Sequence, residues 1–498
     1  MGLTAKPSGS IDDGKGDTMT EPRLIEISPV TRVEGHGKVT IHLDRDNNVD
    51  EARLHIVEFR GFERFIQGRL LWEVPVIVQR LCGICPVSHH LAAAKAMDQI
   101  VGVDVLPPTA EKMRRLMHYG QVMQSHVLHF FHLSAPDLLF GFGAPAAKRN
   151  IFEVLKENPE LGRRAVMMRK FGQEIIEATA GKKIHGTGAI PGGINHNLPI
   201  ATRDHLLAQI DEMLIWAQDA LKLARDYTLD HAELVQNFGA FPSSHMSLVR
   251  QDDGALDLYH GVMRAIDAEG APLIEGLDYN DYHTVLTEDV RSWSYMKFPF
   301  IQALGPDVGW YRVGPLSRMN TAAFIDTPLA NQAHGELRDQ TGGRPNQTTL
   351  TTHWARMIEV VHCVEKIREL LHDDDLQGSD LVAKGERRHE GVGVIEAPRG
   401  NLIHHYKVDE NDQVTFCNLI VSTTHNNEGM NRAVKDVAVK HLSGQEKITE
   451  GMLNHIEVAI RAYDPCLSCA THALGQMPLQ VELFDANGGL LDTATQSA

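Results

Sequence analysis

Four cysteines arranged as two Cys-x-x-Cys pairs are the residues of this chain whose types and spacing point most clearly to chemistry. One pair is Cys82 and Cys85, and the other is Cys466 and Cys469, near the end of the 498-residue sequence. Four thiolates on one ion suit a soft metal. Because the pairs lie near opposite ends of the chain, only the fold could bring them into one site.

Two simpler interpretations of the cysteines fit their spacing less well. A four-cysteine zinc site usually takes both pairs from one short segment, about 15–20 residues apart. A redox dithiol normally lies beside a single βαβ unit. The two remaining cysteines, Cys363 and Cys417, have apolar neighbours and are expected to be small core residues. Spacing alone therefore disfavours zinc without naming another metal.

The residues around both pairs closely resemble the two metal-binding signatures of nickel–iron hydrogenase large subunits. These segments are Arg80–His89 (RLCGICPVSH) and Asp464–His472 (DPCLSCATH). Three further segments fit the same family, namely Arg32–His36 (RVEGH), Arg60–Glu63 (RGFE) and Glu396–Gly400 (EAPRG) followed by His404-His-Tyr406. The resemblance extends from about Ile25 to His472, and the motifs are most like those of the cytoplasmic, NAD-reducing, bidirectional subgroup.

The resemblance implies a nickel ion held by all four cysteines. Cys82 and Cys466 would be terminal ligands, while Cys85 and Cys469 would bridge to an iron that carries carbon monoxide and cyanide. Such a centre splits dihydrogen heterolytically. Cys466 would be the first base, and Glu34 would take the proton onward, because a buried carboxylate with a tuned pKa can relay it. On local sequence alone, a salt bridge between Glu34 and Arg32 is an equally good interpretation.

Three further residues would line the open metal position by resemblance. Arg399 offers a fixed guanidinium that could orient hydrogen and contact a cyanide, and Asp464 would hold it. Thr423 is the matching candidate for a second cyanide contact. The ordinary alternatives are a turn role for an Asp before Pro and strand propensity for Thr. Relatives often have an acidic residue where this chain has Ser125, which puts one hydrogen bond near Arg399 in doubt.

A second metal is also implied. Glu63, the main-chain carbonyl of Leu419 and the imidazole of His472 match positions that bind magnesium in the family. Magnesium prefers oxygen ligands, so iron is the alternative at this position.

Composition limits the partners. The chain has 48 Lys and Arg against 65 Asp and Glu, a net charge of −17, which argues against nucleic acid. No apolar run reaches the roughly 18 residues that a membrane helix needs, and no signal peptide begins the sequence, so we expect a cytoplasmic protein. Six cysteines are too few for an additional iron–sulfur cluster.

The electrons must therefore leave through other subunits. Gly186-Thr-Gly188 is the nearest approach to a dinucleotide fingerprint, but Pro191 stands where the third glycine should be. The resemblance implies a cluster-bearing small subunit, together with diaphorase subunits that bind FMN and NAD. A hydrogen-sensing regulatory protein, or an enzyme that uses NADP or a deazaflavin, would carry the same cysteines and stays open.

Hydrophobic periodicity predicts a mostly α chain with small β pieces (α+β), and the resemblance implies a helical core like that of hydrogenase large subunits. We expect hairpins over residues 39–56 and 392–421. Helices are expected from a Thr109 N-cap to residue 131, over 203–236 and over 352–372. His126, His129 and His132 have the spacing of a metal comb, but their apolar neighbours favour hydrogen bonds within the core.

Three regions are expected along the chain. Residues 1–24 read as a disordered extension and 25–472 as the catalytic subunit. Residues 473–498 contain a short hairpin around an Asn487–Gly488 turn. By resemblance, a maturation endopeptidase would remove this tail after nickel-insertion proteins have loaded the site, leaving His472 as the last residue.

Overall fold

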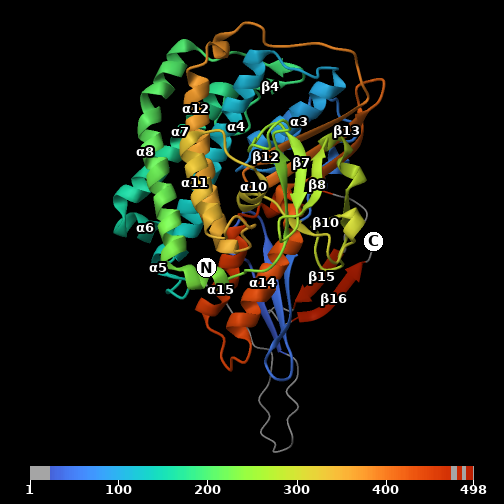
Figure 1. The fold of residues 1–498 in the computed structure, drawn as a ribbon. Helices are drawn as coiled ribbons and strands as arrows, with labels where there is room; N and C mark the ends of the chain where they lie inside the picture. The colour runs from blue at the N-terminus through green and yellow to red at the C-terminus, as the bar shows by residue number, and fades with distance from the viewer. Residues whose placement is uncertain (1–22, 473–478, 485–489, 497–498) are drawn as a thin grey trace, which may run out of the picture.

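The computed structural model describes residues 23–472 and the strands 479–484 and 490–496. A bundle of long helices forms one side of the molecule (Figure 1). Its members are α4 (Pro108–Leu128), α7 (Pro159–Ala180), α8 (Ile200–Asp230), α11 (Pro328–Asp339) and α12 (Thr352–Leu371). Apolar side chains spaced three or four apart on these helices meet in one core cluster, as Leu116, Ile175, Met213 and Ile358 illustrate.

The predicted helices are confirmed, with two changes at their ends. The helix expected over 203–236 is α8, followed after His231 by the short α9 (Ala232–Asn237). Thr109 is not the N-cap, because Pro107 precedes the first helical residue, Pro108. A proline suits that first turn since it lacks the N–H that would be left unpaired there. After Leu128 the helix widens into a π-helical turn, His129–Ser134, and resumes as α5 (Ala135–Phe140).

A three-stranded antiparallel sheet lies at the centre, in the order β12 (Glu390–Ala397), β13 (Gly400–Val408) and β14 (Val414–Ile420). The hairpin expected over 392–421 is present as β13 and β14, and β12 adds a strand on the other side of β13. Helix α3 (Pro86–Ile100) packs on this sheet. Gly391 and Gly393 allow the close approach, because a Cβ at either would lie within 2.1 Å of a carbonyl oxygen of α3.

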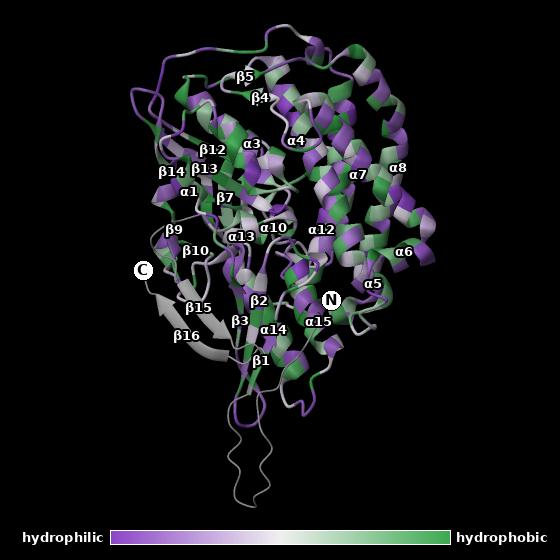
Figure 2. Ribbon diagram, turned by 180° about the vertical axis from the view of Figure 1, so that it is seen from behind, coloured by the Kyte–Doolittle hydropathy of each residue, from purple (hydrophilic) through white to green (hydrophobic). Residues whose placement is uncertain are grey.

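The hairpin expected over 39–56 is confirmed as β2 (Gly37–Leu43) and β3 (Val49–Ile56), with β1 (Arg23–Ile27) paired to β2. Strand β1 takes in Arg23 and Leu24, the last two residues of the expected disordered extension. Helix α14 (Asn427–Leu442) packs on this sheet, and α15 (Glu450–Ala462) packs against α14 in the same core cluster (Figure 2).

Several short strands outside these two sheets were not predicted by the periodicity. One sheet has the order β11-β6-β7-β8, from β6 (Ser244–Val249), β7 (Val262–Ile266), β8 (Pro272–Leu277) and β11 (Tyr311–Arg312). Strands β9 (Leu286–Asp289) and β10 (Phe298–Ile301) form a separate pair, as do the two-residue β4 (Ala189–Ile190) and β5 (Gly193–Ile194). The short remaining helices are α1 (Phe62–Ile66), α2 (Val74–Ile77), α6 (Ile151–Glu157), α10 (Pro315–Thr321) and α13 (Ser422–His425).

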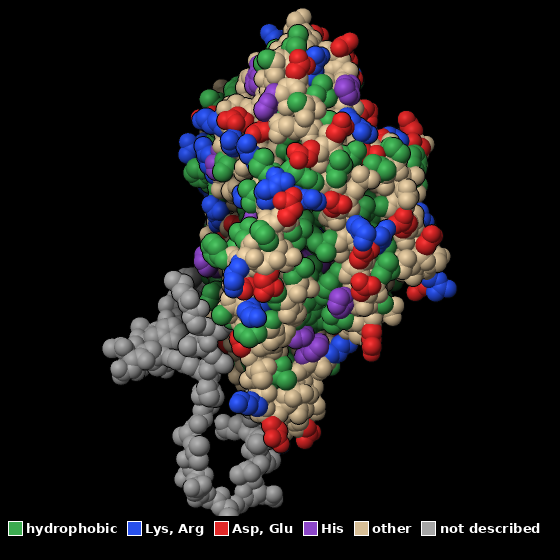
Figure 3. Space-filling model, turned by 90° about the vertical axis from the view of Figure 1, so that its left-hand side faces the viewer, with side chains coloured by type: hydrophobic (Ala, Val, Ile, Leu, Met, Phe, Trp, Pro, Cys, Tyr) green, Lys and Arg blue, Asp and Glu red, His purple; other side chains and the backbone are tan. Residues whose placement is uncertain are grey.

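The C-terminal hairpin is present as β15 (Leu479–Phe484) and β16 (Leu490–Gln496), paired antiparallel. The Asn487–Gly488 turn lies outside the described residues, as do residues 1–22. The architecture is the expected helical core with small sheets. No helix in the described ranges has the length and apolarity needed to cross a membrane. On the face in Figure 3, described acidic and basic side chains are interspersed without a continuous basic stripe.

Candidate metal centre

The fold brings all four predicted cysteines together in its interior. Their sulfur atoms lie within 4.8 Å of one another, and all four residues are buried. The Sγ atoms of Cys82 and Cys466 are 3.3 Å apart, and those of Cys466 and Cys469 are 2.7 Å apart. Among the described residues, this is the only group of three or more Cys, His, Asp or Glu side chains placed to share one ion. Four converging sulfurs fit a thiophilic metal.

The first pair is shaped by the start of α3. Cys85 is the residue just before the helix, and Pro86 occupies its first turn. The main-chain N–H groups of Ile84 and Cys85 both donate to Sγ of Cys82 at 3.2 Å. Hydrogen bonds from Cys466, Cys469 and Cys82 lower the pKa of the Cys85 thiol. A helix N-terminus also favours a thiolate.

The second pair is held against the N-terminal motif by a short parallel β-bridge between Glu34 and Cys466. The N–H of Leu467 donates to the Glu34 carbonyl at 2.9 Å. Gly35 follows with a φ of +85°, and a Cβ there would lie 2.6 Å from the Ser468 nitrogen. The glycine of the RVEGH motif thus permits both the turn and the close contact.

The carboxylate of Glu34 reaches the cysteine cluster directly. Its Oε2 accepts hydrogen bonds from Sγ of Cys466 at 2.9 Å and from the N–H of Ser468 at 3.2 Å, and Oε1 accepts from the Ser468 hydroxyl. Arg32 points elsewhere, because it donates to Asp137 at 2.6 Å and to the Leu133 carbonyl. The alternative salt bridge between Glu34 and Arg32 is therefore wrong.

Arg399 and Asp464 form the expected pair beside the cluster. The Nε of Arg399 donates to the Asp464 carbonyl at 2.6 Å, and Nη2 donates to Oδ1 at 2.9 Å. Burial raises the pKa of Asp464 to about 6, against the opposing effects of Arg399 and Arg356. The hydroxyl of Ser125 accepts a hydrogen bond from Nη1 of Arg399 at 3.4 Å. Ser125 therefore keeps the hydrogen bond with Arg399 that the absence of an acidic residue at this position had put in doubt.

Thr423 lies beside the second cysteine pair, where its Oγ1 accepts a hydrogen bond from the N–H of Cys466 at 2.9 Å. A small enclosed cavity adjoins this hydroxyl, and Cys85, Cys466 and Arg399 also line it. Two of the four cysteines and the polar side chains of Arg399 and Thr423 therefore line the same space.

The three residues expected at a second metal lie in neighbouring segments. The N–H groups of Arg60 and Gly61, just before Glu63, donate to the Thr471 carbonyl, just before His472. Oε1 of Glu63 accepts from the N–H of Leu419 at 2.9 Å. Burial raises the pKa of Glu63 and lowers that of His472 to about 3. Nδ1 of His472 is buried without a partner, so a neutral imidazole nitrogen is free to bind a cation.

The histidine comb does not form a metal site in the described structure. His126 contacts Oε2 of Glu359 at 2.8 Å, and His129 donates to the Arg461 carbonyl at 2.7 Å. The two imidazoles thus make separate buried hydrogen bonds, as the apolar neighbours predicted. Cys363 and Cys417 are buried core residues, and burial raises the pKa of both thiols.

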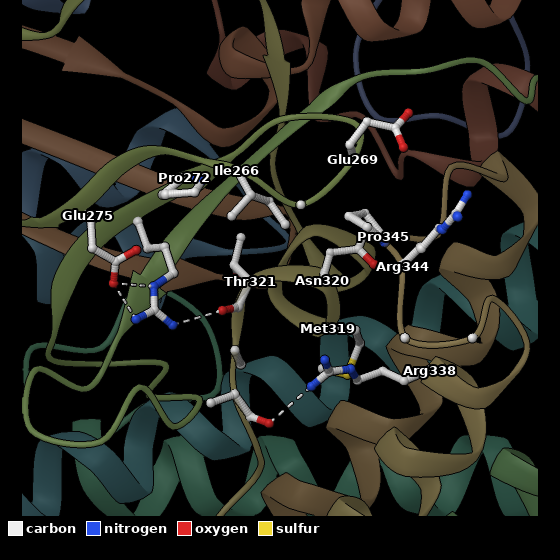
Figure 4. Close-up of a pocket in the computed structure, with 16 residues that line it drawn as sticks. Ile266, Glu269, Pro272, Glu275, Met319, Asn320, Thr321, Arg338, Arg344 and Pro345 are labelled. Carbon is white, nitrogen blue, oxygen red and sulfur yellow. Dashed lines mark hydrogen bonds and ion pairs between the residues drawn. The ribbon is translucent and has the colours of Figure 1, made fainter.

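A surface cleft lies apart from this cluster, between β7, β8, the end of α10 and the loop after α11 (Figure 4). Glu275 accepts from Arg264 at 3.0 Å, and Arg338 donates to the Ala323 carbonyl at 3.2 Å. None of the predicted site residues lines this cleft.

Sequence reasoning missed two groups that lie beside the cysteines. Ser468 binds Glu34 from inside the second cysteine pair, and nothing in a Cys-x-x-Cys pattern marks such a residue. His89 lies against Cys85 and shares a hydrogen bond of 3.1 Å with His404, which contacts the Tyr406 hydroxyl at 2.7 Å. All three residues belong to the matching motifs, but their mutual contact depends on the packing of α3 against β13.

Comparison with known proteins places this geometry in a family. Residues 60–149 and 253–472 match the family described as nickel-dependent hydrogenase, and residues 24–59 match one described as HoxL-like. The chain is 52% identical over 484 residues to the beta subunit of the NAD-reducing hydrogenase HoxS of Cupriavidus necator, covering 94% of this chain and 99% of the relative. It is 42% identical over 475 residues to a subunit of the F420-non-reducing hydrogenase of Methanothermobacter marburgensis, covering 94% and 99%.

Solved structures agree. A crystal structure of an NAD+-reducing NiFe-hydrogenase in the H2-reduced state has a TM-score of 0.89 and 58% identity, covering 90% of this chain and 99% of that chain. A Ni-Fe-Se hydrogenase from D. vulgaris Hildenborough, at 22% identity and a TM-score of 0.74 over 91% of this chain and 100% of that chain, shares the fold. The family match over residues 60–149 and 253–472, together with the 52% identity over 94% of the chain, shows that the chain belongs to the nickel-dependent hydrogenase family.

Proposed function

We propose that this chain is the catalytic subunit of a nickel–iron hydrogenase that cleaves H2 reversibly and passes the electrons, through partner subunits, to NAD+. The observation that carries the proposal is the buried cluster of four cysteine sulfurs, one of which hydrogen-bonds to the Glu34 carboxylate. The identities of 52% and 58% to two NAD-reducing hydrogenases support the acceptor. The F420-non-reducing relatives make a different acceptor the alternative outcome.

The cysteines supply the ligands of the centre. We assign Cys82 and Cys466 as terminal ligands of nickel, and Cys85 and Cys469 as bridges to an iron with carbon monoxide and cyanide ligands. When bound, this centre would supply the heterolytic cleavage of H2. The protein supplies four sulfurs in one buried place and shields them from water, so that charges there interact strongly.

Proton transfer away from the centre is assigned to Cys466 and Glu34. The Cys466 sulfur would hold the proton first, and the hydrogen bond of 2.9 Å leads from it to Oε2 of Glu34. A proton acceptor within hydrogen-bond reach is the geometric requirement for this step. Ser468 fixes the carboxylate through both of its oxygens, so Glu34 is held in a position to accept.

Arg399, Asp464 and Thr423 would form the polar wall of the site. Two hydrogen bonds to Asp464 fix the plane of the Arg399 guanidinium, which leaves Nη1 to face Ser125 and the adjoining cavity. A preorganised donor of this kind stabilises charge without reorganising during the reaction. We assign contacts with the cyanide ligands to Arg399 and Thr423.

A second cation is proposed at Glu63, the Leu419 carbonyl and His472. A carboxylate and a carbonyl suit magnesium, and the unpartnered imidazole nitrogen of His472 would also suit iron. This cation would fix the end of the catalytic region beside the second cysteine pair.

Partner subunits are proposed for the electron path. Six large apolar side chains between residues 57 and 76 are exposed, and the same segment contains the RGFE motif and leads to the first cysteine pair. They are Val57, Phe59, Phe65, Leu70, Trp72 and Val76. Exposed apolar side chains concentrated in one segment are typical of an interaction site. We propose that they are covered by a cluster-bearing small subunit, and that diaphorase subunits carry FMN and NAD.

The position at which the family match ends supports maturation by cleavage of the chain. The family match ends at His472, and the NAD+-reducing structure spans 90% of this chain although 99% of that chain is aligned. We propose that nickel-insertion proteins load the site and that an endopeptidase then removes residues 473–498. The mature chain would work in the cytoplasm, where an enzyme coupled to NAD(H) meets its acceptor.

Elemental analysis and infrared spectroscopy of the purified complex test the proposal. We expect one nickel and one iron at the cysteine site and infrared bands from carbon monoxide and cyanide. Stoichiometric zinc without those bands would overturn it. Hydrogen-dependent reduction of NAD+, NADP+ and a deazaflavin, assayed side by side, identifies the acceptor. A complex that binds the metals but lacks turnover would instead indicate a hydrogen sensor.

A further inference from the structure

Behind Cys85, a line of three buried side chains connects the first cysteine pair to the central sheet. His89 lies on α3, while His404 and Tyr406 lie two residues apart on β13 and so project from the same face of the strand. Nδ1 of His89 and Nε2 of His404 are 3.1 Å apart, and Nδ1 of His404 is 2.7 Å from the Tyr406 hydroxyl. All three are at most 1% exposed.

Each imidazole in this line uses both of its nitrogens. His404 contacts His89 with Nε2 and Tyr406 with Nδ1. His89 contacts His404 with Nδ1. It lies on α3 four residues after Cys85, so the two side chains share one face of the helix start, and both line the small cavity beside the sulfur cluster. An interaction with His89 is also among the causes that lower the pKa of the Cys85 thiol. Because Nδ1 of His89 is already occupied, Nε2 is the nitrogen left for the sulfur. His404 is buried, and its two nitrogens contact an imidazole and a hydroxyl instead of a carboxylate, so its ring is neutral and carries a single N–H.

A neutral imidazole donates from one nitrogen and accepts at the other, so the direction of one hydrogen bond fixes the next. If the Tyr406 hydroxyl donates to Nδ1 of His404, then Nε2–H of His404 donates to Nδ1 of His89. His89 must then carry its proton on Nε2, which points at the Cys85 sulfur. If Tyr406 accepts instead, every bond reverses and His89 presents a bare nitrogen to a sulfur that cannot donate as a thiolate.

We propose that Tyr406 is a positioning residue: by donating to Nδ1 of His404, its hydroxyl stabilises the tautomers of His404 and His89 in which His89 donates a hydrogen bond to the Cys85 thiolate. The proposal rests on the nickel–iron centre assigned above, where Cys85 is a bridging ligand. A hydrogen bond to a ligating sulfur withdraws electron density from the metals, and such bonds are a recognised means of tuning metal centres. Tyr406, which is separated from Cys85 by the side chains of His404 and His89, would therefore adjust the electronic properties of this ligand.

A neighbouring tyrosine provides a matched control. Tyr282 is also buried, and its hydroxyl is 3.0 Å from Nδ1 of His405. His405 lies between His404 and Tyr406 in the sequence and therefore points to the opposite face of β13. Replacing Tyr282 by Phe removes the same hydroxyl from the same kind of Tyr–His pair without touching the line to Cys85.

The experiment is infrared spectroscopy of the complete complex in one redox state, with wild type, Tyr406→Phe and Tyr282→Phe compared at equal nickel content. We expect the carbon monoxide band of Tyr406→Phe to move to lower wavenumber, because a thiolate without its N–H donor gives more electron density to the metals. The band of Tyr282→Phe should stay at the wild-type position. His404→Gln interrupts the line one residue closer to Cys85 and should also move the band. It takes the place of Tyr406→Phe if that variant incorporates too little nickel to measure.

Each contrary outcome has one meaning. A band that is unmoved in Tyr406→Phe, or in His404→Gln where Tyr406→Phe holds too little nickel to measure, overturns the tautomer proposal and leaves the hydrogenase function standing. A band that moves equally in Tyr406→Phe and Tyr282→Phe does the same. A wild-type complex with no carbon monoxide or cyanide band removes the proposed metal centre and this inference with it.

Discussion

The carboxylate of Glu34 accepts a hydrogen bond from the Cys466 sulfur, and the main-chain carbonyl of Glu34 accepts one from the N–H of Leu467. One residue therefore fixes both the chemistry and the position of the second cysteine pair. Glu34 and Cys466 are 432 positions apart in the sequence. The carboxylate of Glu34 and the thiol of Cys466 therefore stay close together unless the β-bridge between them opens.

Replacing Glu34 by Gln should leave the metals bound and lower hydrogen turnover about 100-fold or more, because the amide keeps the shape but cannot take the proton. Hydrogen–deuterium exchange and nickel analysis measure the two effects. Glu58→Gln, which changes a carboxylate that pairs with His36, is the control and should keep normal exchange. Near-normal exchange in Glu34→Gln would exclude the relay.

Gly35→Ala should reduce nickel incorporation and activity, because the added Cβ would lie 2.6 Å from the Ser468 nitrogen and push the β-bridge apart. Gly68→Ala is a matched control, since Gly68 has a φ of +83° and nothing within 4 Å of the added Cβ. Both variants should lose about 1–2 kcal/mol from the left-handed backbone, but only Gly35→Ala should lose metal. Equal nickel contents would contradict the proposed role of the close contact.

Arg399→Lys should lower turnover about 100-fold while nickel stays bound, since an ammonium cannot reproduce the two-point bond to Asp464 or the planar donor that faces the cavity. Steady-state hydrogen oxidation and metal analysis test this expectation. Arg388→Lys is the control, because Arg388 forms an exposed pair with Asp104, and neither residue belongs to the predicted site. If both variants turn over like wild type, Arg399 is not part of the catalytic machinery.

Acid should destabilise the protein through its buried histidines. The native pKa of His118 is lowered to about 4 and that of His425 to about 3, in both cases because burial disfavours the charged ring. Unfolded histidines have pKa values near 6.5. Below about pH 6.5 the unfolded chain binds protons that the native chain does not, so stability is present above that pH and falls as the pH drops.

Each such histidine should contribute a loss of about 1.4 kcal/mol per pH unit between about pH 6 and pH 4. Urea denaturation at several pH values gives the slope. His118→Gln should make the slope shallower, while His205→Gln, which changes an exposed histidine, should leave it unchanged. A stability that is independent of pH over this range would contradict the expectation.

Active protein should end at His472. The intact mass of this chain in the active complex decides this, because removal of residues 473–498 is a loss that mass spectrometry resolves easily. The same measurement on protein produced without nickel should give the full-length chain. An active chain that retains Ala473 to Ala498 would show that the tail is a stable part of the enzyme.

The sequence predicted those parts of the fold that carry a regular hydrophobic pattern. Helices α8 and α12 and the hairpin of β2 and β3 were foreseen because their apolar residues recur with a clear period. Strand β6 was missed because five of its six residues are buried, so nothing alternates along it. Strand β11 is two residues long and pairs parallel with β6, which leaves no local signal at all.

At the site, the four cysteines that converge were evident from the sequence, but their surroundings were not. The cysteine pairs and Glu34 stand in recognisable motifs. That Glu34 contacts Cys466 instead of Arg32 depends on a bridge between distant segments, which no local pattern encodes. The contact between His89 and His404 likewise joins residues 315 positions apart.

The distance along the chain between Cys82 and Cys466 has a consequence for assembly. Joining them in an unfolded chain closes a loop of 384 residues, which costs about 5 kcal/mol in chain entropy. An ion that bound to one cysteine pair would gain little by recruiting the other before folding, whereas in the folded chain the strands and helices already hold both pairs side by side. Nickel bound by all four sulfurs, as proposed above, would then link the two ends of the catalytic region at a site that the fold has already formed.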